Sequence, residues 1–239
     1  MLGNKTGVLI DEFDFTGAFF NAETDHSVAE KDSTVFGALA TLAEPGLSSD
    51  KLMLRGYYSG YAAGAVFKEL RTRLGAAGVG QPLAVLIDTD DANCIAECSA
   101  DSWSKSLKLS LAAPELITFE LNTADNGDMA TGLRIASMTV TEPVAVTGVN
   151  FGSVGAAGGM AFLFVQSIVG VASNAVIKIE SSVPGSYVEE ASFTFSGVGG
   201  YVLPLSGAIG TTIRANVTNL GGATAIKFQA IVCVNGVTY

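Results

Sequence analysis

Basic side chains and histidine are scarce in this sequence, and their scarcity argues against several functions. There are 13 lysine and arginine residues against 23 aspartate and glutamate residues, so the formal net charge is −10. Nucleic-acid affinity depends on neutralising phosphates with basic groups, so nucleic-acid binding is disfavoured. The single histidine, His26, lies between Asp25 and Ser27, but neighbours on an extended chain point to opposite faces, which argues against a catalytic triad. We expect a solvated or interface histidine and no enzyme.

Cysteine is equally rare. Cys94, Cys98 and Cys233 are an odd number without the spacing of a disulfide framework, which indicates reduced residues in a protein made in the host cytoplasm. Cys94 and Cys98 have neither a second cysteine pair nor a histidine pair to complete a zinc site, so structural zinc is not expected.

Other stretches lack the residue that would complete a ligand site. Asp88, Asp90 and Asp91 alternate in a way that can coordinate calcium, but Ser99 stands where the loop needs a bidentate glutamate. A solvated turn is therefore favoured. Residues 152–159 are rich in glycine but have no phosphate-binding lysine and no helix after them. We expect no cofactor and no metal.

Long uninterrupted hydrophobic runs are also missing. The most apolar segment, Met160–Ile177, contains Gln166 and Ser173, with Gly170 near its middle. Two buried strands joined by a turn explain it better than a spanning helix. Residues 1–8 show no apolar signal region, so neither secretion nor a membrane partner is expected.

The residues that are abundant predict an all-β protein. Hydrophobic residues make up 49% of the chain, charged residues 15%, and 28 residues are glycine. This composition, with few helical patterns, predicts many short strands joined by tight turns. One short helix is expected over about residues 62–74, where Val66, Leu70 and Leu74 recur at helical spacing and Gly75 can cap the end.

Charge divides the chain into two parts. Residues 1–142 contain 10 basic and 20 acidic residues, whereas residues 143–239 contain three of each, so the first part carries the whole net charge. We predict an N-terminal assembly domain over residues 1–142 and a C-terminal, surface-exposed domain over residues 143–239. A chain truncated after Glu142 is then expected still to assemble.

Alternating patterns locate the expected strands. Gly37–Asp50 has the turn composition of a long loop, with Pro45-Gly46 and Ser48-Ser49-Asp50. Residues 94–111 are one long strand or a hairpin. In the C-terminal part, short strands separated by glycine, serine and asparagine turns predict a β-sandwich. The other strands are expected at residues 17–25, 33–36, 51–58, 82–88, 116–121, 133–140, 144–151, 160–169, 175–181, 187–195, 201–205, 211–217 and 224–234.

The N-terminal pattern resembles phage tail-tube proteins of the siphovirus kind. The resemblance rests on Gly7-Val8-Leu9-Ile10-Asp11-Glu12-Phe13-Asp14-Phe15-Thr16-Gly17, on Asp32-Ser33-Thr34-Val35-Phe36-Gly37, on the strand Lys51–Tyr58 and on the helix end Leu70–Gly75. It covers residues 7–120. The C-terminal part is similar in style to sandwich extensions of virion proteins.

The resemblance implies a structural subunit whose sheets close into a β-barrel ring, commonly hexameric, and whose rings stack into a conduit for DNA. Its expected partners are copies of itself, other phage tail proteins and double-stranded DNA that passes through the lumen without specific binding. An acidic lumen would let DNA slide without sticking. The candidate assembly loop contains Gly37, Glu44, Pro45, Gly46 and Asp50; the candidate acidic residues of the lumen or interface are Glu23, Asp25, Glu30 and Asp32.

Three alternatives compete with the tail tube. The chain could be another virion part, such as a head decoration or connector-ring protein. The C-terminal sandwich could bind carbohydrate on a host surface, and Tyr57, Tyr58 and Tyr61 could form an aromatic sugar patch, although packing explains these tyrosines better. A hydrolase is the least favoured alternative.

Overall fold

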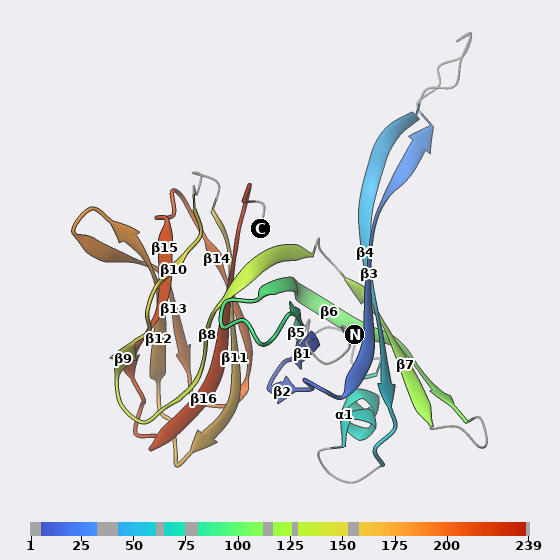
Figure 1. The fold of residues 1–239 in the computed structure, drawn as a ribbon, viewed down its shortest axis with the longest axis horizontal. Coiled ribbons are helices and arrows are strands. Elements are labelled where there is room, and N and C mark those ends of the chain that lie inside the picture. The colour runs from blue at the N-terminus through green and yellow to red at the C-terminus, as the bar shows by residue number, and fades with distance from the viewer. Residues whose placement is uncertain are drawn as a thin grey trace. The chain divides into compact units, whose positions relative to one another are not determined.

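The computed structural model describes residues 6–32, 43–60, 65–74, 81–111, 117–125, 129–152 and 158–237. The described chain is almost entirely β-structure with one short helix, which confirms the predicted all-β class (Figure 1). The elements are β1 Thr6–Ile10, β2 Phe13–Asp14, β3 Phe19–Asp32, β4 Ala43–Tyr57, α1 Val66–Thr72, β5 Gln81–Ile87, β6 Ile95–Ser110, β7 Thr118–Asp125, β8 Ala130–Val140, β9 Val144–Ala145, β10 Val149–Asn150, β11 Gly159–Val169, β12 Ala175–Val183, β13 Ser186–Phe195, β14 Gly199–Leu205, β15 Thr212–Asn219 and β16 Ala225–Val234.

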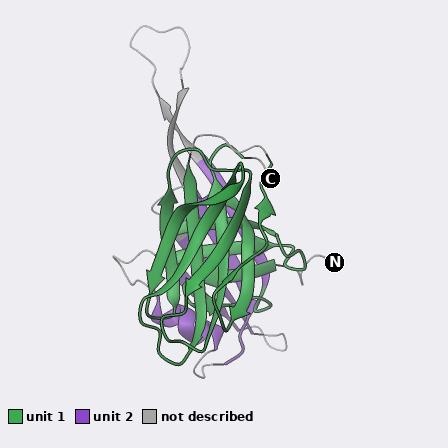
Figure 2. Ribbon diagram, turned by 90° about the vertical axis from the view of Figure 1, so that its left-hand side faces the viewer, with its two compact units in different colours: residues 1–19, 81–100, 130–239 green, residues 20–80, 101–129 purple. Residues whose placement is uncertain are grey.

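Two compact units divide the chain (Figure 2). Unit 1 contains Met1–Phe19, Gln81–Ala100 and Ala130–Tyr239, and unit 2 contains Phe20–Gly80 and Asp101–Met129. This division does not coincide with the predicted boundary between residues 142 and 143. The reason is that β1, β5, β8 and the first half of β6 share a sheet with the C-terminal strands.

Unit 1 contains a sandwich of two sheets. One sheet has the order β14-β11-β16-β8-β6-β5-β1-β2, and the other has the order β10-β15-β12-β13, with β9 pairing with β15. Alternate side chains of the facing strands, such as Ile177 and Ile179 of β12, are buried in the core between the sheets. The C-terminal strands therefore form a sandwich, but β8, which precedes residue 143, belongs to it as well. Its strands form where expected, except that residues 144–151 divide into β9 and β10.

Strands β11 and β16 lie at the centre of unit 1 because both of their faces are buried. On β11, Leu163 and Val165 enter the sandwich core, whereas Phe162 and Phe164 enter a second core on the opposite face. A continuous apolar run is typical of a strand that is buried on both sides. The buried members of the second core are Leu9, Ala84, Leu86, Cys94, Ala96, Cys98, Phe162, Phe164, Ile231 and Cys233.

The larger sheet of unit 1 curls around this second core. The strands at its two ends contact strands farther along the same sheet: β2 contacts β11, and β14 contacts β5. The turn after β1 joins them: Asp11 N donates to Pro82 O at 3.0 Å, and Gly200 N donates to Asp11 Oδ1. A Cβ atom at Gly200 would lie 2.2 Å from Pro82 Cγ, so this close approach requires glycine.

Unit 2 is a four-stranded antiparallel sheet with the helix against one face. The strand order is β3-β4-β7-β6, where β6 contributes its second half. Phe67 and Leu70 of α1 are buried, and the ring centroids of Phe67 and Phe119 lie 5.9 Å apart in an edge-on arrangement. The helix begins at Val66 rather than near residue 62; residues 61–64 lie outside the described chain.

The predicted loop Gly37–Asp50 is wrong over Ala43–Asp50, which belongs to β4. This segment forms a strand despite its turn composition because it pairs with β3. In a two-stranded ribbon each strand has a hydrogen-bonded neighbour on one side only, so a proline whose nitrogen faces the other side breaks no hydrogen bond. Among the described residues of β4, Lys51–Tyr57 are the ones that pair with β7. On the N-terminal side of Lys51, β4 continues next to β3, and the two strands form a two-stranded ribbon (Figure 1). Gly37 and the strand expected at residues 33–36 lie outside the described residues.

Strand β6 is a single long strand, and β7 continues to Asp125 where a turn was expected from Asn122.

The shared sheet changes what a truncated chain should do. A chain that ends at Glu142 loses β11, β14 and β16, and with them Phe162, Phe164 and Ile231 of the second core. We expect its unit 1 strands not to fold, because their apolar faces lose their cover. Assigned NMR spectra should show dispersed amide signals for Leu9 and Ala96 in the full chain and random-coil shifts for them in residues 1–142, whereas signals of unit 2 can stay dispersed. A truncated chain with native dispersion for Leu9 and Ala96 would contradict the shared core.

Candidate functional site

The exposed face of the unit 2 sheet is polar, and strand register sets its side chains in rows. Arg55 of β4 and Lys108 of β6 both lie opposite Glu120 of β7. In the next row, Met53 and Ser106 lie opposite Asn122. Because side chains alternate along a strand, both rows project from one face of the sheet.

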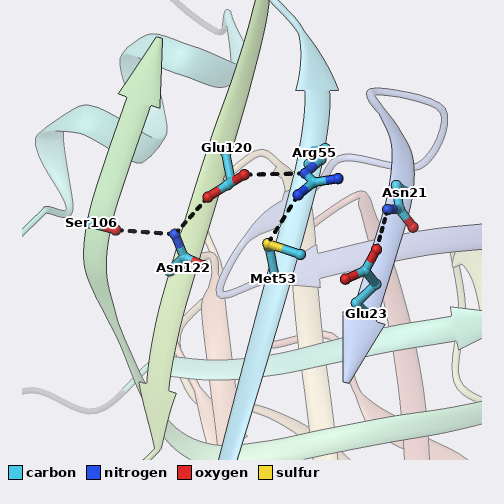
Figure 3. A network of polar contacts seen from close by, with 7 residues as sticks. All are labelled: Asn21, Glu23, Met53, Arg55, Ser106, Glu120 and Asn122. Atoms are coloured by element: carbon cyan, nitrogen blue, oxygen red, sulfur yellow. Dashed lines mark hydrogen bonds and ion pairs between the residues drawn. The ribbon is translucent and has the colours of Figure 1, made fainter. Parts of the chain in front are cut away.

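Hydrogen bonds connect these rows into a network (Figure 3). Glu120 accepts from Arg55 Nε at 3.1 Å and from Asn122 Nδ2 at 3.1 Å. The Asn122 amide also donates to Ser106 Oγ at 3.1 Å. The hydrogen bond from Asn122, followed by that from Arg55, holds the pKa of Glu120 below its ordinary value. The carboxylate therefore stays ionised and locally neutralises Arg55.

Two of the predicted acidic residues lie beside lysines on the same unit. Glu23 accepts a hydrogen bond from Asn21 Nδ2 at 2.7 Å on β3. Glu23 and Asp25 line a depression of about 590 Å³ together with Lys51 and Lys105. The face is therefore of mixed sign rather than uniformly acidic. The side chains of Glu30 and Asp32 lie outside the described part, and a lumen position for any of the four stays a prediction.

Asp50 anchors the ribbon where it leaves the sheet. The residue is 9% exposed; Oδ1 lies 3.0 Å from His26 Nδ1, and Oδ2 accepts from Met129 N at 2.5 Å. Asp50 was predicted to lie in a loop, and the composition of the segment around it did not indicate this anchoring role. The anchor joins β3, β4 and the residue just before β8. Glu44, Pro45 and Gly46 lie within β4, farther along the ribbon.

The tyrosines of unit 2 pack against other rings. Tyr57 lies with its ring centroid 4.7 Å from that of Phe20, and Tyr58 meets Phe67 edge-on at 5.2 Å. Tyr57 and Phe20 remain 50% and 41% exposed, so they form an exposed aromatic pair. Tyr61 lies outside the described residues.

The acidic turn after β5 is organised by a buried arginine. Asp91 N donates to Asp88 O at 2.9 Å, and the Arg134 guanidinium donates to the carbonyl oxygens of Thr89, Asp91 and Ala92. These carbonyls are directed at a cation that the protein itself supplies. In the described chain, histidine, cysteine, aspartate and glutamate do not gather into a group of three that could hold a metal.

The cysteines offer no accessible nucleophile. Cys94, Cys98 and Cys233 are buried free thiols. Burial, followed by a hydrogen bond with Cys233, raises the pKa of Cys98 well above its ordinary value. A neutral, enclosed thiol is a packing residue in this core.

The outer face of the smaller sheet in unit 1 is also polar. Glu180 accepts from Arg214 Nε and from Asn216 Nδ2, both at 2.8 Å. Burial alone raises the pKa of Glu180, but these hydrogen bonds outweigh it and hold the pKa below its ordinary value. Arg214 also lies 3.7 Å over the ring of Tyr187. That aromatic face is therefore covered by the guanidinium, which disfavours stacking of a sugar on it.

In the part of the chain that the structure describes, no helix has both the length and the apolar character needed to cross a membrane.

Comparisons with known proteins give partial likenesses of fold. No protein-family model matches the chain, and no curated protein does. A chain from the virion of a native gene transfer agent particle has 14% sequence identity and a TM-score of 0.41, and the match covers 55% of this chain and 98% of that one. A chain from the sheath-tube complex of an extracellular contractile injection system, PVC, has 12% identity and a TM-score of 0.39, over 54% and 88%. A chain from the baseplate of the anti-feeding prophage, AFP, has 10% identity and a TM-score of 0.41, over 53% and 89%. These neighbours belong to phage tail-like particles.

The Glu180 network makes the stability of unit 1 depend on pH. Glu180→Gln should lower the free energy of unfolding at pH 7 by about 1–2 kcal/mol, because hydrogen bonds to a charged group are lost. Since the folded pKa lies below the ordinary value of 4.5, this contribution is complete above that value and is lost as the pH falls through the folded pKa. Urea unfolding should show that the difference in unfolding free energy between the wild type and Glu180→Gln becomes smaller below pH 4.5. Glu189→Gln is the control, because its carboxylate is 45% exposed and the change should be under about 0.5 kcal/mol.

Removal of the Asp50 anchor should loosen the base of the ribbon. Asp50→Ala takes the acceptor from Met129 N and the partner from His26. Hydrogen exchange at the Met129 amide should accelerate by about tenfold or more, since one net hydrogen bond corresponds to roughly that factor. Exchange measured by NMR gives the result, with Asp25→Ala as the control. Unchanged protection at Met129 would contradict the anchoring role.

Proposed function

We propose that this chain is a non-enzymatic structural subunit of a phage tail, assembling with copies of itself into stacked rings around a conduit for DNA. Unit 2 forms the contacts between copies, and the polar outer sheet of unit 1 faces solvent. The protein is made in the host cytoplasm and functions in the virion, next to other tail proteins.

The observation that carries this proposal is the charge on the two outer strands of unit 2. Strand β3 contains four acidic residues and one lysine, whereas the unit 2 part of β6, Asp101 to Ser110, contains Lys105, Lys108 and one acidic residue, Asp101. Pairing of β3 in one copy with β6 in the next would bring opposite charges together and would cover both edges. Such a head-to-tail contact closes into a ring when the rotation between copies allows it.

The polar network supports a wall past which DNA can move. A phosphate is held by basic groups that are available to it. Arg55 already pairs with Glu120, and Lys108 lies opposite the same carboxylate. Lys51 and Lys105 share their depression with Glu23 and Asp25. A face whose cations have acidic neighbours offers few places where DNA would be retained.

The ribbon supports contacts beyond the ring. A two-stranded ribbon has little stability by itself, because few of its side chains are buried. Here its base is fixed by Asp50, so β3 and β4 can present a defined edge to another copy. The predicted assembly residues in β4 would then form part of the paired strand that is presented to the other copy.

Charge reversal tests the proposal. One variant carries Lys105→Glu and Lys108→Glu, and a second carries Glu23→Lys and Asp25→Lys. Each alone should fail to assemble, since like charges then meet at the contact. An equimolar mixture should recover rings or tubes, because each variant offers an edge that fits the other. Negative-stain electron microscopy and analytical ultracentrifugation report the outcome.

The matched control is Lys178→Glu with Lys227→Glu, two reversals in unit 1, which should leave assembly unchanged. Assembly by both unit 2 variants alone would contradict pairing through these edges. Closed single rings that never stack would favour the connector-ring or decoration alternative over the tube.

A further inference from the structure

Strand β8 has a neighbour on both sides in its first part and on one side in the rest. Toward β6, the pairing covers Ala130–Leu133, and Arg134 N then donates to Cys94 O at 3.0 Å. Beyond this point β8 still pairs with β16, but no other strand of the described chain lies on its other side. Ile135–Val140 therefore form an open sheet edge in the part of unit 1 that the structure describes.

The register of β8 shows which amides face the open side. Arg134 N points toward β6 and so away from β16. The pairing with β16 shifts by one residue between Arg134 and Ala136, which places a bulge there. Hydrogen bonding alternates along an antiparallel strand, so the backbone amides of Ser137 and Thr139 point outward and those between them point to β16. Ser137 and Thr139 also have exposed side chains.

A depression of about 560 Å³ lies beside this edge. Its walls come from β8, from the turn after β5 and from Val146–Val149. Met138 and Val146 are half-buried and Val149 is buried, so part of the wall is apolar. The volume lies in the range of ligand sites. An open edge beside an apolar wall suits strand addition, in which the main chain supplies hydrogen bonds and alternate side chains enter pockets.

A buried arginine lines the same depression and has a donor to spare. Arg134 is 7% exposed. Its Nε and Nη2 donate to three carbonyl oxygens of the turn after β5, and Nη1 has no acceptor among the described residues. A buried donor favours a hydrogen-bond acceptor. A backbone carbonyl of an added strand would supply one without burying a second charge.

We propose that the open edge Ile135–Val140 binds an extended segment of another protein, in which apolar residues alternate with polar ones and lysine or arginine is present. The charge follows from the turn beside the depression, which exposes Asp88, Asp90 and Asp91 and would repel an acidic segment. The basic strand of this chain, β6, is already assigned to the contact between copies, so a different protein is the fitting partner. The edge lies in unit 1, and its failure to bind would leave the proposed unit 2 contacts unaffected.

Selection from a library of random linear peptides, with the full chain as bait, tests the edge. Enriched peptides should alternate apolar and polar residues and carry basic ones. The double variant Ser137→Lys with Thr139→Lys should bind a synthetic copy of the enriched peptide about tenfold or more weakly in isothermal titration calorimetry, because like charges then meet at the edge. Thr131→Lys is the matched control and should bind normally, since this exposed residue lies where β8 already pairs with β6.

Hydrogen exchange measured by NMR locates the bound peptide. Exchange of the Ser137 and Thr139 amides should slow by about tenfold or more, since one net hydrogen bond corresponds to roughly that factor. The Met138 amide should not change, because it already faces β16. Acidic enriched peptides, equal binding by the double lysine variant or a selection without any enriched peptide would overturn the proposal. Enrichment of a sequence from this chain would also overturn it and would make a second copy the occupant.

Discussion

Burial of both faces of β11 and β16 is the constraint on which unit 1 depends. One face of each strand closes the sandwich against the smaller sheet, and the other face fills the core inside the curled sheet. Alternation normally assigns one face to solvent, but here successive residues such as Leu163 and Phe164 are both inaccessible. The N-terminal strands β1 and β5 therefore need the C-terminal strands for cover, although they are far apart in the sequence.

The sequence predicts the C-terminal strands well because their periodicity is strong. Alternation from Ile226 to Val234 and the apolar run near Phe162 follow directly from where the side chains are buried. The boundary between units is not readable in this way, because it depends on which distant strands pair. Charge asymmetry divides the chain at a different place, since it reports on surface composition and not on shared cores.

The candidate site shows the same limit. Glu23 and Asp25 were identifiable as exposed acidic residues, but their lysine neighbours come from β4 and β6 and become visible only in the folded sheet. Asp50 stands in a stretch with turn composition, so local rules assign it to a loop. Its two partners, His26 and Met129, are separated from it by 24 and 79 positions, and no local pattern encodes them. The open edge of β8 likewise has no sequence signature, because it begins where pairing with β6 ends.

The interleaving of the two units has a consequence for synthesis on the ribosome. Unit 2 is complete once Met129 has emerged, whereas unit 1 must wait for β16, the last strand to be made and one of its two central ones. For most of that interval, unit 2 can be folded while the apolar faces of β1 and β5 remain uncovered. An unfinished chain therefore exposes these apolar faces to neighbouring nascent chains on the same messenger until its last strand has been made.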